Sequence, residues 1–228
     1  MTDELVYKPT LVHTGCDWIT VTTHGGKAST NLFEAGQFLL REAITLGNQK
    51  KPWSMSGFHG YKAGCAQVGT RDKEVMIRLS SDFAHQYWRE VYDDADNCTR
   101  FDVQATFRVS SEVGPLLKRH FDQAKRIHEK RSRAPTLSAL STNNGPSTIY
   151  FNRRVSEAFG RIYDKGAESK LDQWRDCIRY EVEFKGTEAR RRSAFVRQQK
   201  NSDLAAGSLA IEFFAGRGIR LGKLTIYC

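Results

Sequence analysis

The spacing of apolar and polar residues along the chain predicts a sheet interrupted by a few helices. Strict alternation or a short apolar run, flanked by turn residues, is typical of a strand, and apolar residues three and four apart are typical of a helix. The predicted strands are residues 17–23, 75–79, 98–109, 147–153, 160–165 and 177–185, with a hairpin over 57–69 and further sheet over 209–228. The predicted helices are residues 31–46, 81–92, 118–133 and 187–201. Ser80 or Ser81 is the predicted N-cap of the second helix, and residues 134–146 are predicted to form a loop.

Two of these strands share a short motif. Cys98-Thr-Arg-Phe-Asp-Val103 and Cys177-Ile-Arg-Tyr-Glu-Val182 match in cysteine, arginine, an aromatic residue, an acid and valine, and a basic helix is predicted after each. The match predicts a single domain over residues 1–228, with related halves at roughly 14–133 and 145–228. The expected fold class is α+β, with a curved, largely antiparallel central sheet and helices packed on its outer face.

The amino-acid composition argues against a disordered, a membrane-spanning and a secreted protein. Of 228 residues, 39% are hydrophobic and 11% aromatic, which excludes a disordered chain, and no apolar run approaches the roughly 18 residues of a membrane helix. The first residues include Asp3 and Glu4 and do not resemble a secretory leader. The five cysteines are scattered without a C-x-x-C pair. We therefore expect a cytoplasmic protein with reduced thiols and no membrane partner.

Positive charge is concentrated in two segments. Lys and Arg total 35 against 26 Asp and Glu, a formal charge of +9, which indicates a polyanionic partner. Residues 118–133 hold seven basic and two acidic side chains, and residues 185–200 hold six and one. One such run is often only a solvated helix face, but two of them favour a phosphate-binding surface. The expected DNA contacts on these segments are Lys118, Arg119, Lys125, Arg126, Arg190, Arg191 and Arg192.

The polar positions of the predicted strands carry the candidate chemistry. Asp102 and Glu181, with Glu183 as a third acid, offer hard oxygen donors for Mg²⁺ or Mn²⁺, and we expect the first two carboxylates within about 5 Å of each other. Tyr150 and Tyr163 lie on the predicted hairpin beside Arg153, Arg154, Arg161 and Lys165. A tyrosine with a pKa of about 10 is a poor nucleophile at neutral pH, but cations and a metal favour its phenolate.

These groups together suggest phosphodiester transfer through a covalent phosphotyrosine. Each of them also has a structural interpretation. A strand tyrosine is usually half-buried packing, and strand carboxylates opposite arginines are often ion pairs.

One stretch of the chain resembles a known family. The run S-T-I-Y-F-N-R-R-V-S-E-A-F-G-R-I-Y-D-K-G-A-E-S-K, Ser147 to Lys170, resembles the replication initiation factor family, the Rep_trans-type initiators of rolling-circle plasmids and phages and related conjugative relaxases. Further pieces agree in order: S-G-F-H-G-Y from Ser56, T-R-F-D-V from Thr99 and I-R-Y-E-V-E-F-K-G from Ile178. The resemblance covers roughly residues 14 to 200.

The resemblance implies a metal-dependent enzyme that nicks one strand at an origin and later rejoins it. It places the nucleophile at Tyr150, the metal ligands at Asp102 and Glu181, and phosphate contact or support at Arg161, Tyr163 and Lys165. The products would be a 5′-phosphotyrosine and a free 3′-OH. The implied partners are origin DNA, single-stranded or extruded at the nick, host helicase and polymerase, and a second copy in a homodimer.

The chain departs from the family pattern at two places. Asn152 stands where the family usually has glycine, and the chain stops at Cys228 without the extension common in these initiators. These departures favour one alternative, a non-enzymatic DNA-binding protein with the initiator fold. A second alternative also stays open: a metal-dependent endonuclease that uses water, in which the acids Asp102, Glu181 and Glu183 matter and Tyr150 does not.

Overall fold

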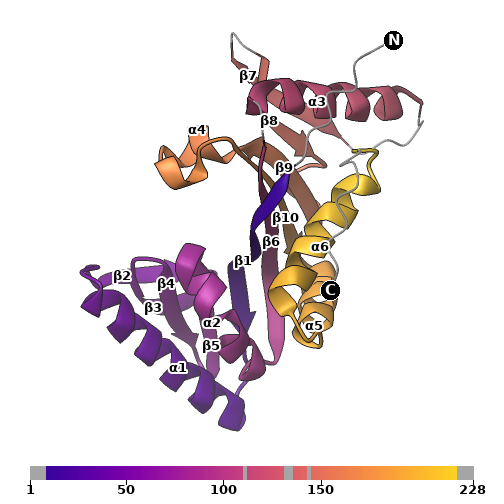
Figure 1. Ribbon diagram of the computed structural model, residues 1–228. Helices are drawn as coiled ribbons and strands as arrows, with labels where there is room; N and C mark the ends of the chain where they lie inside the picture. The colour runs from indigo at the N-terminus through magenta and orange to yellow at the C-terminus, as the bar shows by residue number, and fades with distance from the viewer. Residues whose placement is uncertain (1–8, 110–111, 131–135, 143–144, 220–228) are drawn as a thin grey trace, which may run out of the picture. The chain divides into compact units, whose positions relative to one another are not determined.

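A ten-stranded sheet forms the framework of the protein in the computed structural model, which describes residues 9–109, 112–130, 136–142 and 145–219 (Figure 1). The strand order is β2-β3-β4-β5-β1-β6-β10-β9-β8-β7. The strands are β1 (Thr10–Thr22), β2 (Lys51–Met55), β3 (Phe58–Ala63), β4 (Ala66–Arg71), β5 (Glu74–Ser80), β6 (Asn97–Arg108), β7 (Leu137–Thr142), β8 (Gly145–Phe151), β9 (Ala158–Asp164) and β10 (Cys177–Lys185). The helices are α1 (Gly26–Thr45), α2 (Ser81–Asp93), α3 (Val113–Lys130), α4 (Lys165–Ser169), η1 (Asp172–Trp174), α5 (Gly186–Arg197) and α6 (Ser202–Ala215).

The predicted α+β class with a largely antiparallel sheet is confirmed. β2 to β5 form an antiparallel meander, β1 pairs antiparallel with β5, and β7, β8 and β9 form a second antiparallel meander. The strands predicted from alternation are all present, and β10 has the predicted bounds. Side chains alternate between the two faces of any strand, so this pattern predicts a strand without knowledge of its neighbours in the sheet.

Three local predictions are wrong. The stretch expected as a loop over 134–146 contains β7 and the start of β8, because Ser and Thr residues there pair with β8 in a ladder. Residues 209–215, expected as sheet, end helix α6, which begins at the Asn201 cap, whose side chain accepts from Leu204 N at 3.1 Å. A short apolar run fits a buried helix as well as a buried strand.

The predicted cap of α2 and the predicted end of the terminal sheet have different outcomes. Ser80 precedes α2 but makes no capping hydrogen bond with its side chain. Residues 220–228 of the predicted terminal sheet lie outside the described residues.

The chain divides into two compact units, and β1, β6 and β10 each contribute residues to both. The tyrosine unit comprises residues 1–15, 103–183 and 199–228, and the hairpin unit comprises 16–102 and 184–198. The predicted halves at 14–133 and 145–228 stay a prediction.

In the tyrosine unit, helices α3 and α6 pack on one face of the sheet. The Phe214 ring of α6 contacts Phe151 and Tyr180, with ring centroids 5.2 and 5.7 Å apart. Gly160 of β9 allows this approach, because an added Cβ would lie 2.3 Å from the Phe213 ring. The same face carries Ile149, Ile162 and Phe107, all fully buried. This face holds the core of the unit, and the opposite face carries the polar residues.

Helix α3 is tied to this core by a buried polar pair. His120 Nε2 lies 2.7 Å from Tyr180 Oη, and Nδ1 lies 3.4 Å from Gln123 Oε1. With Nδ1 as the donor to the Gln123 oxygen, Nε2 is the acceptor of a hydrogen bond from the Tyr180 hydroxyl. Burial lowers the pKa of His120 to about 4 and raises the pKa of Tyr180. Both groups are therefore neutral at physiological pH.

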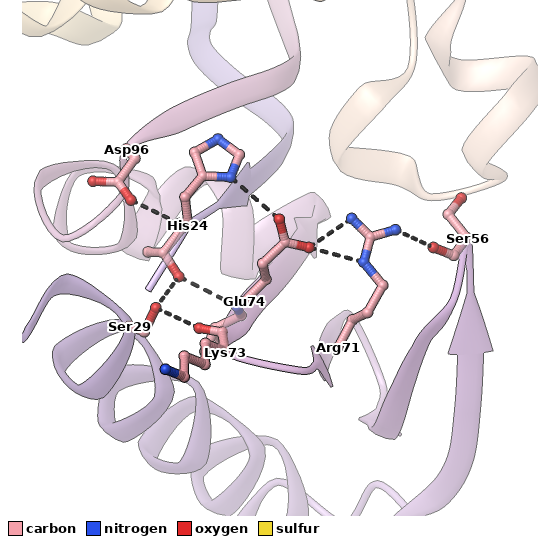
Figure 2. A network of polar contacts seen from close by, with 9 residues as sticks. His24, Ser29, Ser56, Arg71, Lys73, Glu74 and Asp96 are labelled. Carbon is pink, nitrogen blue, oxygen red and sulfur yellow. Dashed lines mark hydrogen bonds and ion pairs between the residues drawn. The ribbon is translucent and has the colours of Figure 1, made fainter. Parts of the chain in front are cut away.

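In the hairpin unit, a polar network links the turn between β4 and β5 to α1 and to the end of β1 (Figure 2). Arg71 donates to Glu74 Oε2 through Nε and Nη2 at 2.8 and 2.6 Å, and His24 Nδ1 lies 3.3 Å from Glu74 Oε1. The hydrogen bond from Arg71, with that from His24, lowers the pKa of Glu74. Ser29 donates to the Lys73 carbonyl at 2.9 Å. These contacts set the ends of the strands and carry no candidate chemistry.

The four described cysteines, Cys16, Cys65, Cys98 and Cys177, are free thiols. Burial raises the pKa of Cys98 to about 12, and those of Cys16 and Cys177 are also raised. Among the helices of the described residues, none is both long and apolar enough to cross a membrane.

Candidate active site

The register of the second meander places Tyr150 on the face opposite to the helices. Tyr150 of β8 pairs with Arg161 of β9, and Thr148 pairs with Tyr163. Residues opposite each other in an antiparallel pair point to the same side, so Tyr150, Arg161 and Tyr163 share one face. Ile149, Phe151 and Ile162 alternate with them and enter the core. We call the face with Tyr150 the open face of the tyrosine unit.

Tyr163 is held rigidly on this face. Its hydroxyl donates to Glu181 Oε2 at 2.9 Å, and Arg161 Nη2 donates to Glu181 Oε1 at 2.7 Å. Tyr163 is 4% exposed and Glu181 is 5% exposed. The Arg161 guanidinium also lies over the Tyr163 ring, 4.9 Å from its centroid. A hydroxyl that is buried and already donating to a carboxylate is poorly placed to attack a phosphate, which suits a supporting role.

Tyr150 has different surroundings. Its neighbour across the ladder on β7 is Ser138, which is exposed, and its neighbour on β9 is Arg161. The ring is half-buried and stacks on Phe159, with centroids 5.8 Å apart and planes inclined by 19°. Ser138 is small, so on this strand the tyrosine has a short, exposed neighbour. Of the two tyrosines predicted as catalytic, Tyr150 is therefore the accessible one.

The turn after Tyr150 is fixed by Asn152. This residue has φ +67°, in the left-handed region that glycine and asparagine tolerate best. Its Nδ2 donates to the Ala158 carbonyl at 2.7 Å, and its backbone N–H donates to the Thr136 carbonyl at 2.7 Å. Asn152 therefore adopts the left-handed conformation that glycine would also tolerate here, and its side chain adds a hydrogen bond across the turn. Arg153 and Arg154, which we expect from the sequence to contact DNA phosphates, are exposed in the loop that follows.

The ion pair of Lys165 lies within its own helix and does not involve either tyrosine. Lys165 begins α4 directly after Asp164, whose side chain caps that helix by accepting from Ala167 N at 2.9 Å. The Lys165 ammonium pairs with Glu168 at 2.6 Å. The structure places this lysine at the end of β9, and the predicted phosphate contact stays a prediction.

The three predicted metal ligands are buried carboxylates. Asp102, in the hairpin unit, is 2% exposed and accepts from Arg100 Nε and Nη2 at 2.9 and 2.6 Å. Glu181 and Glu183, in the tyrosine unit, are 5% and 6% exposed. Since Asp102 and Glu181 belong to different units, the predicted approach of their carboxylates stays a prediction.

The donor chemistry of these residues suits Mg²⁺ or Mn²⁺. A carboxylate has about four acceptor positions, so an arginine partner leaves room for a cation. Within the described parts of the chain, no three His, Cys, Asp or Glu side chains gather as a metal site of their own. An ion held by one or two carboxylates would need substrate phosphate oxygens to complete its shell, as Mg²⁺ often does in phosphoryl-transfer enzymes.

Sequence reasoning missed a buried polar network on the open face. Arg179 Nε donates to Thr106 Oγ1 at 2.8 Å, and the Thr106 hydroxyl donates to Gln104 Oε1 at 2.8 Å. Gln104 in turn bonds to His13 of β1, and Trp174 packs against both His13 and Arg179. Alternation placed Gln104, Thr106 and Arg179 on a polar face, but it predicted that this face meets solvent. All three are less than 5% exposed.

The two basic helices lie in different units. On α3, Lys118, Arg119, Lys125 and Arg126 are exposed, and His120 points inward to Tyr180. Tyr180 alternates with Glu181 on β10, so α3 covers the face of the sheet opposite to Tyr150 (Figure 1). On α5, in the hairpin unit, Arg191 and Arg192 both pair with Glu188 at 2.8 and 3.1 Å, and Arg190 bonds to Thr187. Residues 131–133 of the first basic run lie outside the described residues.

Comparison with solved structures finds a similar fold in another protein. A structure described as the rolling circle replication initiator protein from Geobacillus stearothermophilus superposes with a TM-score of 0.56, covering 95% of this chain and 100% of that one. The chain has the fold of a rolling-circle replication initiator. The sequences are 16% identical, so the likeness concerns the initiator fold and not the individual site residues. No family model and no curated protein sequence matches the chain.

Proposed function

We propose that this chain is a rolling-circle replication initiator that nicks one DNA strand through Tyr150. The observation that carries the proposal is the contrast between two tyrosines on one face of the initiator fold. Tyr150 is half-buried, with Arg161 and the small, exposed Ser138 as its neighbours, and Tyr163 is buried against Glu181. One tyrosine is free to receive a phosphate, and the other is committed to a structural hydrogen bond.

In the proposed reaction, Tyr150 Oη attacks the phosphorus in line with the 3′ oxygen. The new bond joins the phenolic oxygen to phosphorus, and the bond from phosphorus to the 3′ oxygen breaks. The phenol loses its proton and the 3′ oxygen gains one, which gives a 5′-phosphotyrosine and a free 3′-OH. Arg161, next to Tyr150, provides positive charge where negative charge develops on the phosphate oxygens. Reversal of the same step rejoins the strand.

The proposed metal ligands are Asp102, Glu181 and Glu183. A bound Mg²⁺ or Mn²⁺ would supply Lewis acidity toward the scissile phosphate. Glu181 is oriented by its bonds to Arg161 and Tyr163, so its carboxylate holds one position without rearrangement. The arginines of the turn, Arg153 and Arg154, are proposed to hold flanking phosphates.

The decisive experiment uses a supercoiled plasmid that carries the DNA flanking this coding sequence, incubated with the protein and Mg²⁺ and resolved by denaturing electrophoresis. We expect a nicked strand with protein attached. Tyr150→Phe should eliminate the adduct, whereas Tyr163→Phe should only slow its formation. A nick without attached protein would support the water-dependent endonuclease, and binding without a nick would support a non-enzymatic protein. If Tyr150→Phe formed the adduct at normal yield, with the DNA attached to Tyr163, the assignment of the two tyrosines would be reversed.

The metal ligands are tested in the same assay. Glu181→Gln and Asp102→Asn should abolish nicking and leave DNA binding largely intact. Glu212→Gln, on the exposed side of α6, is the matched control and should nick normally. Nicking by Glu181→Gln at the normal rate would remove this carboxylate from the proposal.

A further inference from the structure

The open face of the tyrosine unit carries an aromatic pair that the core does not require. Phe159 lies two residues before Arg161 on β9, so both side chains point to the face of Tyr150. The Phe159 and Tyr150 rings are close to parallel, 19° apart, with centroids separated by 5.8 Å, an offset stack. Both rings are half-buried, whereas Phe151, Phe213 and Phe214 fill the helix-covered side.

Exposed apolar side chains are present on β7 and in the loop between β8 and β9. Leu140 of β7, which pairs with Thr148 and so shares the face of Tyr150, is 58% exposed. Val155, in the loop between β8 and β9, is 88% exposed. The same loop presents the exposed Arg153 and Arg154. The ring stack and Leu140 on the sheet face, with Val155 and the two arginines of the adjoining loop, offer contacts for the flat face of a base, for its edge and for its phosphate.

We propose that Phe159, stacked on Tyr150, is a platform for one unpaired nucleobase of single-stranded DNA beside the cleaved phosphate. A base within a duplex has both faces covered by its neighbours, so only an unpaired base can present a face to this stack. Stacking on a protein ring is tolerant of base identity, because every base has a π-face. The inference deepens the proposed function and rests on it.

The platform explains how one phosphate is chosen for attack. A base seated against the ring stack fixes the position of its own phosphate relative to Tyr150 Oη and Arg161. Holding the two reacting atoms in line removes the entropy cost of finding that geometry. Phe159 acts through Tyr150 and the DNA, so it is a positioning residue.

The test compares two uncut oligonucleotides in EDTA, so that no cleavage contributes. One is an oligonucleotide of twelve thymidines and the other is an abasic chain of equal length, which keeps every phosphate and has no base. We expect Phe159→Leu to bind the thymidine oligonucleotide about tenfold more weakly and the abasic chain as the wild type does. Phe38→Leu, an exposed phenylalanine of α1 that is 44% exposed, is the control and should change neither affinity.

A second variant keeps the proposal testable if Phe159→Leu fails to fold. Phe159→Trp retains a ring, and we expect it to bind the thymidine oligonucleotide at least as tightly as the wild type. Measured against the wild type, which has four tryptophans of its own, the added indole should be quenched by the oligonucleotide with bases and not by the abasic chain. Equal quenching by both chains, or equal affinity losses for both in Phe159→Leu, would overturn the platform. Because this assay needs no nick, a failure of the Tyr150 adduct test would leave its result readable.

Discussion

Acidification should destabilise the protein through His120, the residue that ties α3 to the strand carrying Glu181. The imidazole is 1% exposed and hydrogen-bonded to the Tyr180 hydroxyl at 2.7 Å. Protonation of this imidazole would place a positive charge in a site closed to water. Burial, which penalises the charged form, therefore lowers the pKa of His120 from 6.5 to about 4.

The size of the stability loss follows from the difference between the pKa of His120 in the unfolded chain and in the folded protein. Between pH 6.5 and pH 4 the unfolded chain binds a proton at this position and the folded chain does not, so the free energy of unfolding falls as pH falls through this window. The full gap corresponds to about 3 kcal/mol, and lowering the pH from about 7.5 to about 5 should remove about 2 kcal/mol. Below about pH 4 both states bind the proton and this contribution is constant.

Urea unfolding followed by circular dichroism at a series of pH values measures this dependence. His120→Asn should be less stable than the wild type near neutral pH but should lose about 2 kcal/mol less on acidification to about pH 5. His128→Gln, at the exposed end of the same helix, is the matched control and should keep the pH profile of the wild type. If the profile of His120→Asn parallels that of the wild type, the histidine is not the titrating group and the reasoning from burial is refuted.

Two further predictions concern the turn and the charges. Asn152→Gly keeps the positive φ and loses one hydrogen bond, so we expect a loss of about 1 kcal/mol, whereas Asn152→Ala adds backbone strain and should lose about 2 kcal/mol; equal losses in urea unfolding would show that φ +67° is not strained. Replacing Arg190, Arg191 and Arg192 by Ala should flatten the dependence of log affinity on log salt by about one unit per lost phosphate contact. Arg175→Ala, which removes an exposed arginine paired with Asp172, is the control, and an unchanged slope in the triple variant would show that the triplet is only solvated.

The strands of the site could be predicted from the sequence because alternation is a property of the chain itself. Residues 98–109 and 177–185 alternate over their whole length, and the structure buries the predicted apolar side of both. The hairpin that carries Tyr150 and Tyr163 was predicted in the same way. Side-chain direction reverses at each residue of a strand, so local order alone sets which residues share a face.

Other features depended on contacts between distant segments. Tyr150 and Tyr163 have similar local sequences, yet only the pairing of Tyr163 with Glu181, 18 residues away, leaves Tyr150 as the accessible hydroxyl. The apolar run 209–215 fits a strand or a helix locally, and in the structure it is the end of a helix whose Phe214 packs against Phe151 and Tyr180, which lie far away in the sequence. The burial of Arg179 depends on Thr106 and Trp174. Periodicity states which side a residue faces, but what covers that side is decided by tertiary packing.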